Sequence, residues 1–385
     1  MRTLLFAAAM LSCLAVRPAS CQTPEPSASL SGFTLTCEDF EDPRAVGNLE
    51  TLCRVWGYAK YHHPVFCDTL CRVDVDSALF VLLPRVVHAD RETRNRHLLD
   101  WVRSLGDYTP NRVECEQSLA PLELVSTVDL AWTRDTTLLG RDLSRLLQDL
   151  RYAERGENYY LRMGTTGNGP GYHYLSLRGE SFHPTPQMDS GLNLLTLFRL
   201  WNIIEYYAPY RAVTLHPWEE VLSTYIPLMG VETDGRRFAR LYMRLIRELN
   251  DGHAYAPIEM LFGQRMLPVW PLQAEGRLFV GYSGDSALER GDEVVAIDGE
   301  PLSERLELLR EYASRSNEAS LRKALRYYGL CTRRDTAEVV LRRAGACDTL
   351  HVATVPYGSV SPLYDPAQLL SLIHISEPTR RTPIS

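Results

Sequence analysis

The chain has 385 residues, of which 45% are hydrophobic and 23% charged, a composition typical of a globular protein with two or three domains. Its formal net charge of -7, with no block of Lys or Arg interleaved with aromatic residues, argues against a nucleic-acid partner. Beyond residue 21 no stretch reaches the ~18 apolar residues of a membrane-spanning helix, so we expect no membrane span in the mature chain.

The first 21 residues are typical of a secretory signal peptide. Arg2 is followed by a short apolar run that ends at Pro18-Ala19-Ser20-Cys21, and this run is too short to cross a membrane as a helix. We expect cleavage after Cys21 and an exported protein of the periplasm or cell envelope. Lipid attachment at Cys21 is the alternative, which Pro18 disfavours. Residues 22–47 are interpreted as a leader or linker.

The cysteines fit an exported protein. Seven remain after Cys13 and Cys21 are removed with the signal, and an odd number leaves at least one thiol free or bonded to another chain. Cys67 with Cys71 and Cys331 with Cys347 are candidate disulfides. No His or further Cys stands at ligand spacing around Cys67, so we expect no metal and no cofactor.

A helical unit is duplicated in the sequence. Residues 48–64 share Asn, Leu, Thr, Leu, Arg, Trp, Tyr and Pro with residues 193–209 at a constant offset of 145, and offsets of 143 and 144 continue the match downstream. We assign residues 48–107 to the first copy and 192–260 to the second, with a connecting segment at 108–191. The leucines and tryptophans of both copies are predicted core, and His62-His63 are expected on the surface at a helix end.

The connecting segment contains one predicted helix over residues 138–150. It also contains a glycine-rich loop at residues 164–171, which lacks the Gly-Lys-Ser/Thr ending of a phosphate-binding loop. We interpret this loop as a turn-rich connection, with a substrate-side loop as the lesser alternative.

The second copy ends in a helix followed by a histidine. Apolar residues at 238, 241, 242, 245, 246 and 249 have the period of a helix with one buried face, Asp234 can cap its start, and Asn250-Asp251-Gly252 can end it. His253 therefore follows a rigid helix, and an imidazole with a reference pKa near ~6.5 can act there as a general base. A capping or packing role is the plainer alternative. The first copy carries Tyr108 at the corresponding position.

Residues 261–357 change to a strand-like period. Residues 277–282 and 293–297 predict strands, Ser303 can cap a helix, a further helix covers 321–328, and 337–341 with 349–353 form a hairpin. The sheet edge of a small β-rich domain can accept an extended peptide as an added strand. The alternative is a packing module without a ligand.

Two motifs in this order resemble those of serine peptidases of the tail-specific and tricorn type. They are L-N-D-G-H-A-Y at 249–255 and L-E-R-G-D-E-V-V-A-I-D-G at 288–299, and residues 198–210 are similar to exported members from Bacteroidetes-like bacteria. The resemblance implies an α+β chain in which a duplicated helical domain precedes a PDZ-like domain that binds a peptide or unfolded protein. A later α/β domain then supplies the nucleophilic serine.

The resemblance also implies a role for His253. It matches the histidine that the tricorn branch takes from its helical domain, whereas another branch uses a lysine. Gly252 departs from the pattern, because a serine precedes that histidine in the tricorn branch.

We expect the nucleophile to lie outside this chain. Residues 358–369 are interpreted as the start of a missing catalytic region, and residues 370–385 resemble a translated transposase sequencing adapter. The chain is therefore predicted to be an inactive N-terminal part of an exported serine endopeptidase. The alternatives are a non-catalytic peptide-binding or envelope scaffold protein and, disfavoured by the absence of H-E-x-x-H, a metal-dependent hydrolase.

Overall fold

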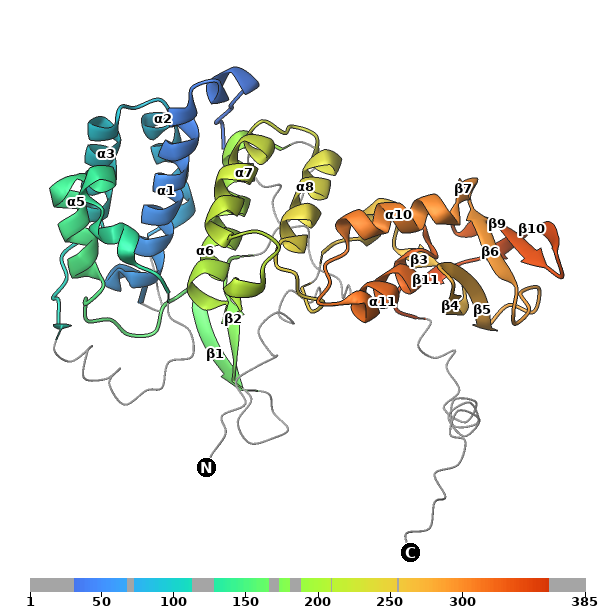
Figure 1. Ribbon diagram of the computed structural model, residues 1–385. Helices are drawn as coiled ribbons and strands as arrows, with labels where there is room; N and C mark the ends of the chain where they lie inside the picture. Colours follow the sequence, from blue (N-terminus) through green and yellow to red (C-terminus); the bar gives the residue numbers. More distant parts are fainter. Residues whose placement is uncertain are drawn as a thin grey trace, which may run out of the picture. The chain divides into compact units, whose positions relative to one another are not determined.

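The computed structural model describes residues 31–67, 73–112, 128–165, 173–180, 188–208, 210–254 and 256–359. The fold is α+β, with the helices concentrated before residue 255 and antiparallel sheets after it (Figure 1). The chain divides into two compact units, Met1–Tyr255 and Ala256–Ser385, and each is described by itself. The predicted signal peptide, Cys71 and residues 360–385 lie outside the described residues.

Two sets of three helices make up most of the first unit. They are α1 (Pro43–His62), α2 (Val75–Val86) and α3 (Arg91–Ser104), followed by α6 (Ser190–Tyr207), α7 (Trp218–Gly230) and α8 (Gly235–Arg247). Five of these six helices begin after an aspartate whose side chain accepts a backbone N–H of the first turn, namely Asp42, Asp74, Asp90, Asp189 and Asp234. A short 3-10 turn precedes α1 at Cys37–Phe40, and others lie between the helices at Pro64–Cys67, Ala131–Arg134 and Arg211–Val213.

The same hydrogen bonds recur in both sets of helices. Asn48 donates its side-chain amide to the carbonyls of Val87 and Ala89, and Asn193 donates to those of Met229 and Glu232. The indole N–H of Trp56 donates to the first residue of α2, and that of Trp201 donates to the first residue of α7. An asparagine and a tryptophan thus hold each set together. The residues of the second set lie 145 positions after their counterparts in the first.

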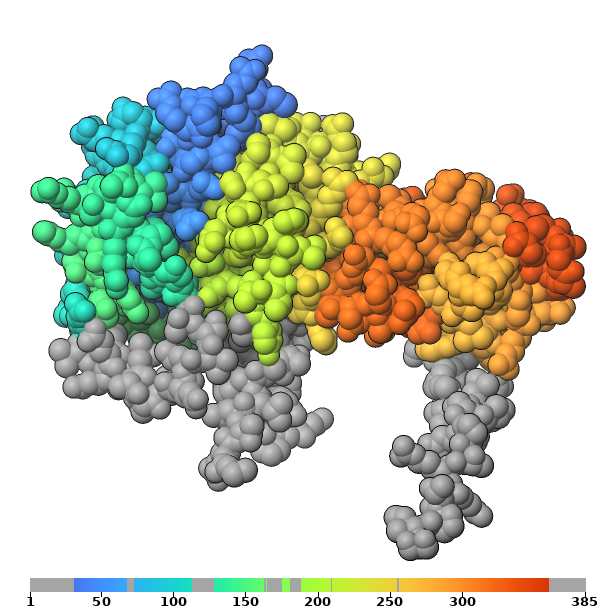
Figure 2. Space-filling view, viewed as in Figure 1, coloured from blue at the N-terminus to red at the C-terminus, as the bar shows by residue number. Residues whose placement is uncertain are grey.

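The two sets pack against each other through α1, which contacts both α6 and α7. Figure 2 shows the blue first helix adjoining the green and yellow second set. Trp56, Phe198 and Phe238 are among the fully buried side chains of this core. Lys60 is also fully buried, where it pairs with Glu180 and lies over the ring of Tyr160.

The connecting segment differs in two ways from its predicted form. Helix α5 (Thr136–Leu150) is interrupted at Gly140, whose φ of 71° lies outside the helical range. Glycine can adopt this conformation without strain because it has no Cβ atom. Strands β1 (Leu161–Thr165) and β2 (His173–Leu177) form an antiparallel pair, so this part of the chain is not all-helical. Gly164 belongs to β1, and residues 166–171 of the predicted glycine-rich loop lie outside the described residues.

His63 is buried and His62 is half-buried, so the prediction of a surface pair is wrong. His63 is 1% exposed, with Nε2 3.2 Å from the carbonyl oxygen of Gly106. The ring of His62 stacks on Tyr58 at 4.0 Å, and its Nδ1 lies 2.9 Å from the carbonyl oxygen of the same residue. The sequence did not reveal this burial because the elements that cover the two rings come from distant parts of the chain.

Between residues 256 and 359, the described part of the second unit, there are three helices and two antiparallel sheets. The helices are α9 (Glu259–Phe262), α10 (Leu302–Tyr312) and α11 (Glu318–Tyr328). The larger sheet has the order β10 (Ala346–Ala353), β9 (Thr336–Arg343), β6 (Glu293–Ile297), β5 (Arg277–Ser283), β4 (Val269–Ala274), with β7 (Glu300–Pro301) paired to β6. The smaller sheet has the order β11 (Val355–Pro356), β3 (Arg265–Met266), β8 (Cys331–Thr332).

The predicted hairpin at 337–353 is confirmed as β9 and β10, with Arg343 paired to Ala346 across the turn. Ala344 and Gly345 both have positive φ, the conformation of a tight hairpin turn that follows the twist of the strands. Two other expectations fail. Ser303 does not cap α10, because that helix already begins at Leu302. Cys331 and Cys347 are not bonded to each other, since one is buried in β8 and the other is exposed on β10.

Within the described residues, we find no helix with the length and apolar character needed to cross a membrane.

Candidate functional site

Helix α8 positions the candidate base, and the predicted helix is confirmed. Asp234 accepts the backbone N–H of Arg237 at 2.8 Å, and Phe238, Tyr242 and Ile246 are buried on one face. Asn250 then takes a φ of 51°, which turns the chain out of the helix, and its side chain donates to the carbonyl of Val213 at 3.0 Å. The segment after α8 is therefore held by hydrogen bonds on both sides of the turn.

Asp251 orients His253. One carboxylate oxygen, Oδ1, accepts the backbone N–H of His253 at 2.9 Å and lies 3.0 Å from its ring atom Nδ1. The backbone carbonyl of Asp251 accepts the N–H of Ala254 at 3.0 Å, which closes the turn. The side chain of His253 is 71% exposed, so the ring faces solvent with its position set by one carboxylate.

This geometry suits proton transfer. When Nδ1 donates to Asp251, the second ring nitrogen, Nε2, carries the lone pair and can accept a proton. A carboxylate beside Nδ1 also stabilises the imidazolium that forms after the transfer. Among the described residues, no serine hydroxyl is hydrogen-bonded to His253, so the pair has a base and an orienting acid without a nucleophile.

A second carboxylate–imidazole pair stands at the same end of α8. Nδ1 of His216 lies 2.7 Å from Oε2 of Glu248, and the hydroxyl of Tyr225 donates to the other oxygen of Glu248 at 3.2 Å. Burial, together with the Glu248 carboxylate, raises the pKa of Tyr225, so its hydroxyl stays protonated as a donor. No sequence pattern predicted this pair, because its histidine and glutamate are 32 residues apart in different parts of the fold.

The second pair lines a pocket of about 340 Å³ between α7 and α8. The side chains of Val221, Leu228 and Leu241 make its apolar part, and Leu228 is 48% exposed. His253 and Asp251 do not line this pocket. The two histidines therefore stand in different environments, one beside an apolar hollow and one on an open turn.

Searching the described residues for three or more His, Cys, Asp or Glu side chains close enough to hold a metal ion finds no such group.

No protein-family model matches this chain, and no curated protein gives a significant match. Among solved structures, mature CPAF complexed with lactacystin aligns with 46% of this chain and 39% of its own, at 19% identity and a TM-score of 0.33. A serine-to-alanine mutant of CPAF, described as a chlamydial serine protease, aligns with 48% of this chain and 38% of its own, at 20% identity and a TM-score of 0.34. This chain thus spans about two fifths of the length of the CPAF chains. A likeness at this level establishes neither a shared activity nor a shared substrate.

Proposed function

We propose that this chain is the N-terminal part of an exported serine-type endopeptidase, and that His253 is its general base. The observation that carries the proposal is the contact between Nδ1 of His253 and the carboxylate of Asp251, which leaves Nε2 available to take a proton. The resemblance of residues 249–255 and 288–299 to motifs of tail-specific and tricorn-type peptidases supports the same assignment.

In the proposed reaction a serine outside the described residues attacks the carbonyl carbon of a peptide bond. His253 takes the proton of the serine hydroxyl at Nε2, and later donates it to the amine that leaves. Asp251 keeps the imidazole in the tautomer that makes this transfer possible. Backbone amides in the serine-bearing domain stabilise the oxyanion of the tetrahedral intermediate.

The second unit is proposed to act as a PDZ-like domain that binds the substrate peptide. Strand β4 is one edge of the larger sheet, and its Trp270 makes an edge-to-face contact with Tyr327 of α11 at 5.6 Å. Leu272 of the same strand is 42% exposed. A sheet edge beside a helix is the arrangement that accepts an extended peptide as an added strand, with alternate side chains entering the space next to the helix.

The first experiment is to resequence the source DNA with long reads from the codon of Gln368 onward. A reading frame that continues into a serine-bearing α/β domain supports the peptidase proposal. A stop codon near Tyr357 overturns it, and peptide binding by the second unit then becomes the working function. In that case the chain should bind peptides with a free C-terminal carboxylate in a fluorescence anisotropy titration.

The second experiment tests His253 in the full-length protein that this sequencing defines. We expect His253→Ala to lower kcat for peptide cleavage by about a hundredfold or more, the usual contribution of a general base. His216→Ala is the matched control, because it removes the imidazole of the other carboxylate pair at the same end of α8. Full activity of His253→Ala, or an equal loss in both variants, would contradict the assignment of His253.

A further inference from the structure

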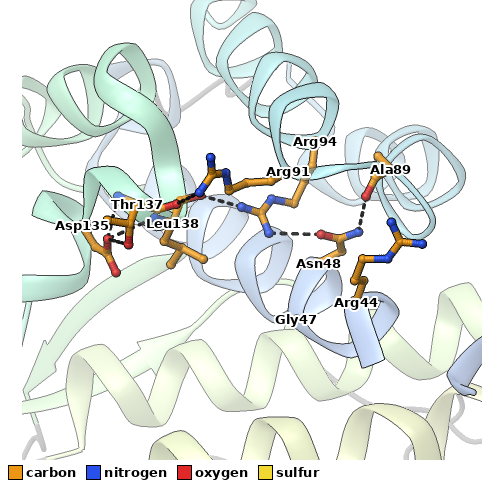
Figure 3. A pocket seen from close by; sticks show the side chains of 9 residues that line it. All are labelled: Arg44, Gly47, Asn48, Ala89, Arg91, Arg94, Asp135, Thr137 and Leu138. Carbon is orange, nitrogen blue, oxygen red and sulfur yellow. Dashed lines mark hydrogen bonds between the residues drawn. The ribbon is translucent and has the colours of Figure 1, made fainter. Parts of the chain in front are cut away.

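A pocket of about 340 Å³ in the first unit is lined by three arginines (Figure 3). It lies where the first turns of α1, α3 and α5 meet. Its lining residues are Arg44, Gly47, Asn48, Ala89, Arg91, Arg94, Asp135, Thr137 and Leu138. Neither His253 nor any other residue of the proposed catalytic machinery takes part in it.

Arg94 is buried without a carboxylate partner. It is 4% exposed, and its guanidinium donates to the side-chain oxygen of Asn48 at 3.1 Å, to that of Asn95 at 2.9 Å and to the carbonyl of Leu138 at 2.6 Å. All three acceptors are uncharged, and none of the acidic side chains in the described part of the chain lies within ion-pairing distance. Burial, reinforced by the positive charge of Arg91, lowers the pKa of Arg94. A buried cation without a counter-ion costs free energy, which a bound anion would recover.

The second copy of the repeat shows that the helix packing does not require this arginine. The position that corresponds to Arg94 is Phe238, which is fully buried, and Arg91 corresponds to Gly235, both at the offset of 144. Arg44 corresponds to Asp189 at the offset of 145. The asparagine that ties the helices together is present in both copies. The three arginines are therefore a property of the first copy alone.

Arg91 is the arginine best placed to meet a ligand from solvent. It is exposed, and Nη1 donates to the carbonyl of Thr137 at 2.7 Å, which holds the guanidinium at the wall of the pocket. Figure 3 shows Arg91 and Arg94 reaching into the same space from successive turns of α3.

The acidic groups near the pocket already accept hydrogen bonds as helix caps. Asp135 caps α5 by accepting the backbone N–H groups of Thr137 and Leu138 at 2.8 and 3.0 Å. Asp42 caps α1 and pairs with Arg44 at 2.7 Å, so that of the three lining arginines Arg91 and Arg94 have no carboxylate partner within the described part of the chain.

We propose that this pocket is a binding site for a small oxyanion of the phosphate type, held by hydrogen bonds from Arg91 and by the buried positive charge of Arg94, with Arg44 at the rim. The planar fork of an arginine donates two parallel hydrogen bonds to phosphate oxygens. The volume accommodates inorganic phosphate or the phosphate of a small monoester. The site is independent of the proposed peptidase activity, because it lies within the first helical copy.

The test is an isothermal titration of the full chain with inorganic phosphate at fixed ionic strength, balanced with chloride. Wild-type protein should bind phosphate, and Arg91→Ala should weaken binding at least tenfold. Arg94→Phe introduces the residue of the second copy and should have the same effect. Arg96→Ala is the matched control, because Arg96 is an exposed arginine on the same helix that does not line the pocket.

Three results would overturn the proposal. They are the absence of phosphate binding by the wild-type chain, equal affinity in wild-type and Arg91→Ala protein, and equal binding of acetate at the same ionic strength. Arg91 is exposed, so its replacement leaves the fold intact and the test stays decisive even where Arg94→Phe fails to fold. A circular-dichroism spectrum of each variant checks this point.

Discussion

Gly57 and Asn202 occupy equivalent positions of the repeat, 145 residues apart, and face each other where α1 meets α6. The side chain of Asn202 fills the space above Gly57, and its Nδ2 donates to the carbonyl of Cys53 at 3.1 Å and to that of Phe198 at 2.8 Å. A Cβ atom at position 57 would overlap the Asn202 amide. The glycine of one copy thus makes room for the asparagine of the other.

Gly57→Ala should destabilise the first unit. The added methyl group forces the buried Asn202 amide away from its acceptors, and overpacking of this kind costs about 1–3 kcal/mol. Urea denaturation followed by far-UV circular dichroism measures the change. Gly47→Ala is the matched control on the same helix, because a Cβ there meets no atom within 4 Å. The double variant Gly57→Ala/Asn202→Ala should recover part of the loss, and an unchanged stability of Gly57→Ala would contradict the close approach of the two helices.

His62 should make the first unit sensitive to acid. Burial, with a smaller contribution from Arg155, lowers the pKa of His62 from 6.5 to about 3. Below about pH 6.5 the imidazole of His62 takes up a proton in the unfolded chain but stays neutral in the folded protein. The free energy of unfolding is therefore highest above that pH and decreases as the pH falls toward 3. The slope is about 1.4 kcal/mol per pH unit.

The measurement compares urea unfolding of wild-type and His62→Phe protein at pH 7 and pH 5. Phenylalanine keeps the stacking on Tyr58 but has no proton to bind, so the wild-type protein should lose about 2 kcal/mol more than the variant over this interval. Parallel pH profiles for wild-type and His62→Phe protein would show that His62 titrates normally in the folded state.

Asp251→Asn should reduce peptidase activity in the full-length protein without unfolding it. The amide retains the shape of the side chain but no longer stabilises an imidazolium at His253, and we expect kcat/KM to fall by about tenfold to a hundredfold, less than for a buried triad because this pair is exposed. Glu248→Gln changes the carboxylate of the other pair and should leave kcat/KM close to wild type. Loss of activity in Glu248→Gln alone would instead assign the base to His216.

The sequence by itself determined the features that depend on near neighbours. The spacing of Phe238, Tyr242 and Ile246 defined α8, Asp234 marked its start, and Ala344-Gly345 marked the turn of the β9–β10 hairpin. These signals are local because helical periodicity, capping and turn conformation each involve residues within a few positions of one another. The sequence also showed the repeat, and it showed that the second copy has His253 where the first copy has Tyr108.

Only the tertiary structure decided which distant residues meet. It buried His63, packed His62 against Tyr58, kept Cys331 apart from Cys347, and brought His216 to Glu248. It also placed Arg94 in a pocket formed by three helices, although the charged sequence around that arginine is typical of an exposed helix face. Such contacts depend on how whole helices pack, and the free energy that selects one packing is spread over many side chains, so no short stretch of sequence specifies it.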